Sequence, residues 1–163
     1  MTRQEYHSAV TEFSSRLYRY VFKCLRNSDD SRDIVQDSYT KLWENRKAVE
    51  FSKSKSWLFT TAHNGLINFL KKQGRTSFFE EGKLDRMNPV SESHRFEVKE
   101  ILEKCLEVLP PVQRSILLLR DLEGYDYKEI GEILDLTESQ VKVYLFRARQ
   151  KLKDNLKDLT ILA

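Results

Sequence analysis

The chain has 163 residues, of which 40% are hydrophobic and 33% charged, and its formal net charge is +3. No apolar run approaches the roughly 18 residues that a membrane span requires, and the first residues lack the apolar core of a signal peptide. Five glycines and three prolines leave too few turn residues for an all-β fold.

Three helices are predicted in the first half of the chain. Apolar residues at spacings of three and four predict a helix over residues 4–26. A second helix is expected over 26–44, with Ser28 as its N-cap. A polar, basic connection over 45–56 then leads to a third helix over 57–73. The buried positions expected for the second helix are Ile34, Ser38 or Tyr39, and Leu42.

The second half is also predicted to be helical, after a stretch that loses periodicity. Residues 74–93 collect Gly, Ser, Asn and Pro, which is typical of a linker. We expect an all-α fold of two small helical domains, residues 1–75 and 95–163, joined by a flexible linker over 76–94. The helices predicted in the second domain cover residues 94–108, 111–122, 126–134 and 137–157, with Pro111 in a first turn and Gly124 at a helix end.

Residues 125–153 have the pattern of a helix-turn-helix. A tight turn at Asp135-Leu136 separates a short helix from a longer one, and Thr137 with Gln140 forms a capping box. Gly131 lies within the first helix, where glycine is unfavourable, and it indicates a close approach of the two helices. A generic αα-hairpin shows the same features, so the distribution of charge has to separate the two interpretations.

Charge is unevenly divided along the second half. Residues 97–136 hold five Lys or Arg and ten Asp or Glu, a net charge of −5, whereas residues 137–153 hold five basic residues against Glu138, a net charge of +4. A basic stripe on one helix is typical of phosphate contact in nucleic-acid binding. The alternative is a solvated helix face of mixed charge.

Two hydrophobic residues fall on the wrong side of this basic helix. Val141, Leu145 and Ala148 form its buried stripe, while Val143 and Phe146 lie on roughly the opposite face. In a recognition helix they would contact thymine methyl groups or sugars in the major groove. Packing on a neighbouring helix or on a partner protein is the alternative for Phe146. The candidate residues for reading duplex DNA are Ser139, Gln140, Lys142, Val143, Phe146, Arg147 and Arg149.

These motifs resemble two regions of one protein family. "LPPVQRSILLLRDLEGYDYKEIGEILDLTESQVKVYLFRARQKLK" (109–153) closely resembles region four of bacterial sigma factors, which binds the −35 promoter element. "SDDSRDIVQDSYTKLWE" (28–44) and "SWLFTTAHNGLINFLKK" (56–72) resemble their region two. With only these two regions, the chain is similar to the compact extracytoplasmic-function (ECF) class of the sigma-70 family.

The resemblance implies both partners and contact residues. The implied partners are promoter DNA, core RNA polymerase through its β′ clamp helices and β flap, and an anti-sigma factor. Residues matching the polymerase-binding segment are Asp33, Gln36, Asp37, Lys41 and Leu42. The connection and third helix match the reader of the separated −10 strand, where cations hold the backbone and aromatics hold unstacked bases. Its candidates are Lys53, Ser54, Lys55, Trp57, Asn64, Asn68, Lys71, Lys72 and Arg75, with a place in the core as the alternative for Trp57.

The linker sets a condition on this function. Twenty extended residues reach at most about 70 Å, and two turns of DNA span roughly 70 Å. One chain can therefore touch both promoter elements only if its linker is substantially stretched on the polymerase. We expect the free protein to bind DNA poorly. The acidic residues 97–136 offset the charge of the basic helix, and the two modest DNA interfaces gain strength only when the polymerase fixes the distance between them.

No enzyme chemistry is expected. The histidines His7, His63 and His94 are scattered, and no nucleophile, metal-ligand or phosphate-loop pattern is present, so we expect no catalytic residue, metal or cofactor. Cys24 and Cys105, 81 positions apart, are expected to be quiet core thiols in a reducing cytoplasm. Two rival functions stay open at this level: a stand-alone helix-turn-helix regulator, and a protein-interaction adaptor built from two helical bundles.

Overall fold

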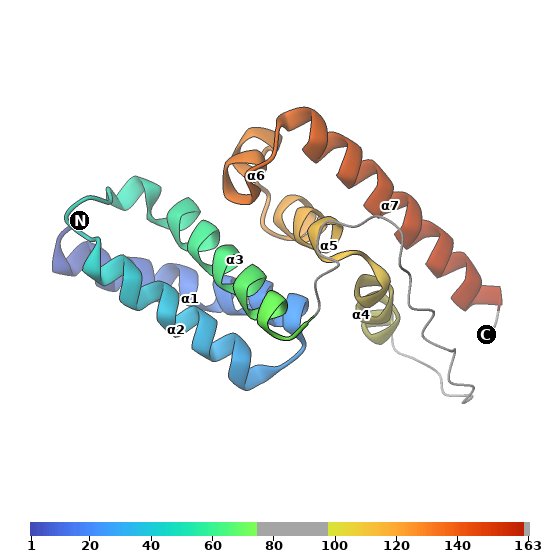
Figure 1. Ribbon diagram of the computed structural model, residues 1–163, viewed down its shortest axis with the longest axis horizontal. Coiled ribbons are helices and arrows are strands. Elements are labelled where there is room, and N and C mark those ends of the chain that lie inside the picture. Colours follow the sequence, from blue (N-terminus) through green and yellow to red (C-terminus); the bar gives the residue numbers. More distant parts are fainter. Residues whose placement is uncertain (75–97, 162–163) are drawn as a thin grey trace.

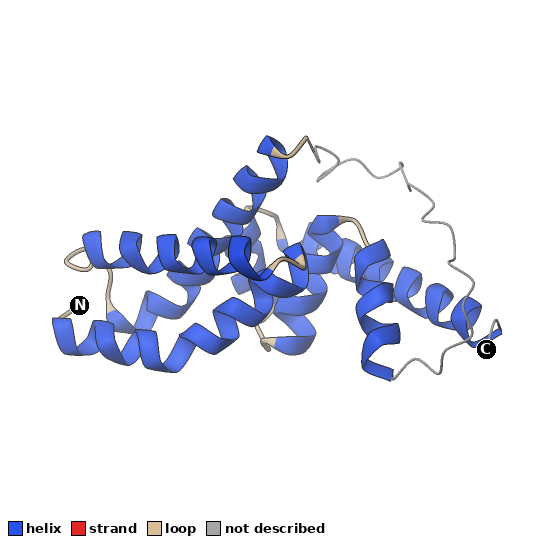
Figure 2. Ribbon diagram, turned by 90° about the horizontal axis from the view of Figure 1, so that it is seen from below, coloured by secondary structure: helices blue, strands red, loops and turns tan. Residues whose placement is uncertain are grey.

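The computed structural model describes residues 1–74 and 98–161. Within these ranges all regular secondary structure is helical (Figures 1 and 2), which confirms the all-α prediction. The N-terminal unit, residues 1–74, contains α1 (Arg3–Leu25), α2 (Ser28–Glu44), the short helix η1 (Phe51–Lys53) and α3 (Ser54–Lys72). The C-terminal unit, residues 98–161, contains α4 (Val98–Val108), α5 (Pro111–Leu117), the π-helical turn η2 (Leu118–Leu122), α6 (Tyr127–Leu134) and α7 (Glu138–Ile161). The predicted linker, 76–94, and the candidate Arg75 lie outside the described residues.

Local capping explains where most helices begin and end. Asn27, rather than the predicted Ser28, is the N-cap of α2, because its side chain accepts a hydrogen bond from the Asp30 amide. Pro111 opens α5 as predicted, and Gly124 follows η2 with a φ of 75°. The start of the third helix was predicted three residues late, since η1 leads directly into α3 at Ser54.

Three helices enclose the core of the N-terminal unit. α1 packs against both α2 and α3, and α2 packs against α3. Apolar residues at helical spacing supply the contacts, because one face of each helix is turned inward. The largest fully buried apolar and aromatic side chains of this core are Leu17, Tyr20, Leu42, Leu58, Phe59 and Leu66.

The C-terminal unit is built around the inner face of α7. Val141, Leu145 and Ala148 are buried as predicted, and Leu152 is half-buried against the same core. α5 and α6 both pack on α7, and α4 crosses it nearer the C-terminal end (Figure 1). Cys105 is buried in α4, and Cys24 is buried in the N-terminal unit, both as free thiols.

The two units touch. α3 packs against α6, and α1 packs against α5, so that buried residues of both units form one continuous apolar cluster. Figure 1 shows α5 and α6 lying against the N-terminal helices, with α7 on the outer side of the C-terminal unit. This arrangement leaves one candidate DNA surface outside and places the other beside the inter-unit contact.

Candidate nucleic-acid interface

The helix-turn-helix of the C-terminal unit is locally fixed by its turn. The Leu136 amide donates a hydrogen bond to the Gly131 carbonyl at 2.9 Å. A Cβ on Gly131 would lie 2.6 Å from the Leu136 carbonyl oxygen, so only glycine fits here. The predicted close approach is therefore confirmed, and its partner is the backbone of the turn. The predicted capping box is also present: the Thr137 amide donates to Gln140 Oε1 at 2.9 Å, and the Gln140 amide donates to Thr137 Oγ1 at 3.2 Å.

The outer face of α7 carries the two misplaced hydrophobic residues. Val143 is 46% exposed and Phe146 is 71% exposed, as the helical period predicts. Around them, the polar and basic candidates Ser139, Gln140, Lys142 and Arg147 are all exposed. We call this set, with Val143 and Phe146, the α7 face. A large exposed aromatic side chain among cations fits a groove that offers both methyl groups and phosphates.

Three contacts hold cations beside the α7 face. The Lys142 ammonium lies 5.5 Å from the Tyr127 ring centroid, and Arg120 lies 4.7 Å from the same ring. Arg149 Nη2 donates to Asp121 Oδ1 at 2.7 Å, and this hydrogen bond raises the pKa of Arg149. Arg149 is thus partly neutralised by Asp121 of its own unit.

The predicted −10 candidates are divided between open and covered positions. Lys53, Asn64, Asn68, Lys71 and Lys72 are exposed, while Trp57 is half-buried against the core. Ser54 is removed from the candidate set, because it is fully buried and its hydroxyl donates to the Phe51 carbonyl at the start of α3. Lys55 is half-buried beneath the C-terminal unit, with its ammonium 4.5 Å from the Tyr125 ring centroid.

The predicted polymerase-binding residues lie on the outer side of α2, with one exception. Asp33, Gln36, Asp37 and Lys41 are exposed, and Lys41 Nζ lies 2.7 Å from Asp37 Oδ2. Leu42 is fully buried and cannot contact a partner from this position, so it is corrected to a core residue. Its helical spacing with Ile34 and Ser38 already indicated this.

Sequence reasoning missed the contact between the two units. Arg16 Nε on α1 donates to Glu123 Oε2 at 2.8 Å, although the two residues are 107 positions apart. Arg114 Nη1 on α5 donates to the Cys24 carbonyl at 2.9 Å, and Arg26 pairs with Glu103 and Glu107 of α4. No local pattern marks these residues, because each resembles an ordinary surface charge of its own helix.

One buried histidine lies within the N-terminal core. His63 Nδ1 is 3.0 Å from the Tyr20 hydroxyl, and burial lowers the pKa of His63 to about 4. Burial likewise raises the pKa of Tyr20. Both groups are therefore neutral near pH 7, and they form a polar contact inside the apolar cluster.

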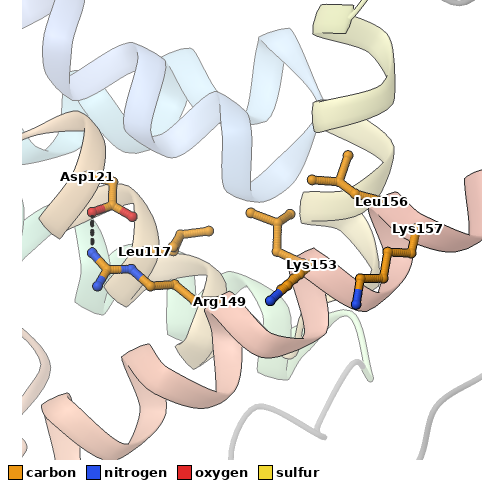
Figure 3. Close-up of a pocket in the computed structure, with 7 residues that line it drawn as sticks. Leu117, Asp121, Arg149, Lys153, Leu156 and Lys157 are labelled. Atoms are coloured by element: carbon orange, nitrogen blue, oxygen red, sulfur yellow. Dashed lines mark hydrogen bonds and ion pairs between the residues drawn. The ribbon is translucent and has the colours of Figure 1, made fainter. Parts of the chain in front are cut away.

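Among residues 1–74 and 98–161, no group of three or more His, Cys, Asp or Glu is arranged to hold a metal ion. None of the described helices is long and apolar enough to cross a membrane. A hollow of about 370 Å³ lies along α5, η2 and α7 (Figure 3). It is lined by three leucines, three cations and one carboxylate: Leu117, Leu152, Leu156, Arg149, Lys153, Lys157 and Asp121.

Comparison with known families covers both units. Residues 9–76 match Sigma-70 region 2, and residues 99–152 match Sigma-70, region 4. The chain is 30% identical over 149 residues to an ECF RNA polymerase sigma-E factor of Salmonella typhimurium, covering 81% of this chain and 76% of that protein. The chain belongs to the ECF group of the sigma-70 family. Sigma factors of this family direct RNA polymerase to specific promoters to initiate transcription.

Further relatives and solved structures agree with this membership. This sigma factor is 29% identical over 144 residues to the ECF RNA polymerase sigma factor SigM of Bacillus subtilis, covering 86% of this chain and 88% of SigM. Its fold resembles RpoE of Bartonella quintana, solved with the anti-sigma factor NepR, at a TM-score of 0.75 and 22% identity over 94% of this chain and 98% of that one. It also resembles CnrH, solved with the cytosolic domain of CnrY, at a TM-score of 0.69 and 19% identity over 96% of this chain and 90% of that one.

Proposed function

We propose that this sigma factor reads −35 duplex DNA with the α7 face and captures the separated −10 strand with α3 and the segment before it. The observation that carries the proposal is the exposed Phe146 with Val143 among Lys142 and Arg147. Leaving a phenylalanine 71% exposed is unfavourable in water. Packing against base methyls or sugars would remove this cost, and the neighbouring cations would release counterions from phosphates.

The N-terminal unit, residues 1–75 as predicted, would bind core polymerase through the exposed side of α2. Asp33, Gln36 and Asp37 present two carboxylates and an amide on this side, and Lys41 is ion-paired there. The C-terminal unit, residues 95–163 as predicted, would contact the β flap while it holds the −35 element. Residues 76–94 would connect the two units.

Promoter recognition on this scheme is a binding task without covalent chemistry. The protein would work in the cytoplasm as an initiation factor and not as an enzyme. The Bartonella quintana relative of the same fold was solved with an anti-sigma factor. An anti-sigma factor is accordingly a partner to expect for this chain.

In vitro transcription on a library of genomic fragments tests the proposal. Core RNA polymerase alone, and core polymerase with this protein, are compared by sequencing the transcripts. We expect a small set of shared start sites that appears only with the protein. Tight, sequence-specific DNA binding by the protein alone, with no effect on start sites, would contradict the proposal and favour a stand-alone regulator.

A further inference from the structure

A tyrosine at the start of the helix-turn-helix lies against two cations. Tyr127 is the first residue of α6, and its ring centroid lies 4.7 Å from the Arg120 guanidinium carbon and 5.5 Å from the Lys142 ammonium. Both distances are within the range of a cation–π contact. Lys142 belongs to the α7 face, whereas Tyr127 and Arg120 come from α6 and η2. The ring therefore connects one proposed DNA contact to elements outside α7.

The Tyr127 ring is fixed before any DNA is bound. The capping box around it is complete: the Glu129 amide donates to Asp126 Oδ1 at 2.8 Å, and the Asp126 amide donates to Glu129 Oε2 at 2.9 Å. The ring itself is half-buried and packs against the apolar core. Arg120 is held in the same place, because its Nη1 donates to the Tyr125 carbonyl at 2.9 Å. The ring is thus a preformed platform in the free protein.

Lys142 gains from such a platform because its own side chain is flexible. It is exposed, and a lysine stem has four carbons and many rotamers. Ordering it on DNA costs conformational entropy. A ring that already holds the ammonium in one region lowers this cost, which is how preorganisation strengthens binding. Since Arg120 shares the ring, Lys142 is oriented by the contact and still stays accessible to a partner.

The position of Lys142 makes its orientation important for sequence preference. Lys142 lies near the start of α7, and the first turns of a recognition helix meet base edges in the major groove. The commonest specific partner of a lysine there is a guanine, through its O6 and N7 atoms. Arg149, further along α7, is instead paired with Asp121 (Figure 3).

We propose that Tyr127 is a positioning residue for promoter recognition, whose ring directs the Lys142 ammonium toward a guanine of the −35 element. Tyr127 does not touch the base itself. This inference rests on the proposed function of the α7 face and deepens it, because a determinant of sequence preference then lies outside the recognition helix. Without the ring, Lys142 would spread over more rotamers, and the preference for its guanine would weaken while other base pairs are read as before.

Transcription from a randomised promoter tests this proposal. Core polymerase with the protein transcribes templates in which the −35 element of one of its start sites is randomised, and sequencing gives the preference at each base pair. Lys142→Met keeps most of the stem, removes the charge and identifies the base pair that Lys142 reads. Tyr127→Leu should lower the preference at that same base pair by about 2- to 5-fold. Tyr127→Phe is the matched control, because it keeps the ring, and it should keep the wild-type profile.

The double variant separates positioning from a structural role of Tyr127. Tyr127→Leu combined with Lys142→Met should match Lys142→Met alone, because the ring acts only through Lys142. A further loss in the double variant, or an even loss over all base pairs in either single variant, would overturn the proposal. A stronger preference in Tyr127→Leu would also overturn it, since the ring would then hold Lys142 away from DNA. An unchanged profile for Lys142→Met would instead show that the proposed function fails at this residue, and the inference with it.

The contact itself can be measured without DNA. Protons beside the face of an aromatic ring are shifted upfield, and the ε-methylene signal of Lys142 in ¹³C-lysine-labelled protein reports this shift. Lys142→Met assigns the signal by its loss. We expect an upfield position in the wild type and in Tyr127→Phe, and the ordinary lysine position in Tyr127→Leu. An ordinary position already in the wild type would overturn the contact, and the same spectra show that each variant is folded.

Discussion

The two candidate DNA surfaces of this sigma factor differ in their accessibility. The α7 face is open, with Phe146 71% exposed. The surface around Lys55 on α3 lies under Tyr125 and beside the buried Glu123. The exposure of the α7 face depends only on the folding of the helix-turn-helix itself. The exposure of Lys55 on α3 depends on how the two units are placed. The difference indicates that Lys55, unlike the α7 face and the exposed −10 candidates, is partly covered while the two units stay in contact.

The largest expected effect is on transcription and comes from changing the exposed α7 face. Replacing Lys142, Phe146 and Arg147 together by alanine removes two cations and the exposed ring from the α7 face. At roughly 1 kcal/mol or more per lost contact, promoter-specific transcription should fall by about 100-fold or more in run-off assays with core polymerase.

The control for this triple variant is Arg3→Ala, which removes an exposed cation at the start of α1. It should transcribe like the wild type, and circular dichroism should show native helix content for both variants. Unaltered transcription by the triple variant would indicate that the α7 face does not read DNA and would favour the adaptor function.

The pH dependence of the free energy of unfolding tests whether His63 is buried in the N-terminal core. His63 is buried in α3, and its folded pKa of about 4 lies below the ordinary value of 6.5. The unfolded chain therefore binds more protons between these values, so the free energy of unfolding falls as pH falls from 6.5 to 4. The expected loss is about 1.4 kcal/mol per pH unit, or roughly 3 kcal/mol in total.

Urea unfolding at several pH values measures this loss. His63→Gln should flatten the dependence, while His7→Gln, at an exposed position of α1, should keep the wild-type slope. If His63→Gln and the wild type lose stability in parallel, His63 does not titrate as a buried group.

Gly131→Ala tests the turn that supports the α7 face. The new Cβ would meet the Leu136 carbonyl oxygen at 2.6 Å, and such overpacking costs roughly 1–3 kcal/mol. Thermal unfolding should show this loss. Gly65→Ala is the matched control, because its Cβ would meet only Ile34 Cγ2 at 3.4 Å, and alanine in a helix is favoured over glycine by up to about 1 kcal/mol. Equal losses at both sites would contradict the tight approach.

The smallest expected effect concerns the cap of α7. Thr137→Ala removes the hydroxyl that accepts from the Gln140 amide, at a cost of about 1 kcal/mol of stability. Thr11→Ala, on an exposed part of α1 where the hydroxyl bonds the His7 carbonyl, should cost about 0.5 kcal/mol or less. Urea unfolding curves of the two variants check the difference, and a smaller effect at Thr137 than at Thr11 would argue against the capping box.

Helical periodicity and capping chemistry predicted the open surface well. The period placed Val143 and Phe146 outside and Val141 inside, and Thr137 with Gln140 fixed the start of the helix, because these features depend on neighbours within a few residues. Leu42 shows the opposite case: the period placed it in the core, and the role inferred from the family resemblance was wrong for its side chain.

The covered surface could not be predicted in the same way. Glu123 is one of ten acids in residues 97–136, and nothing near it in the sequence distinguishes a buried carboxylate from nine others. Its burial arises from Arg16, 107 positions away. Ser54 was misassigned for a more local reason, since the helix begins three residues before the predicted start.

The distance between the two units in free and polymerase-bound protein tests the central claim most directly. Fluorophores attached through unnatural amino acids at Lys47 and Gln150, exposed positions of the two units, would report it by energy transfer. We predict high transfer in the free protein and a marked decrease when core polymerase is added. Transfer that stays the same in the free and polymerase-bound protein would contradict two units that are in contact in the free protein and separate on the polymerase.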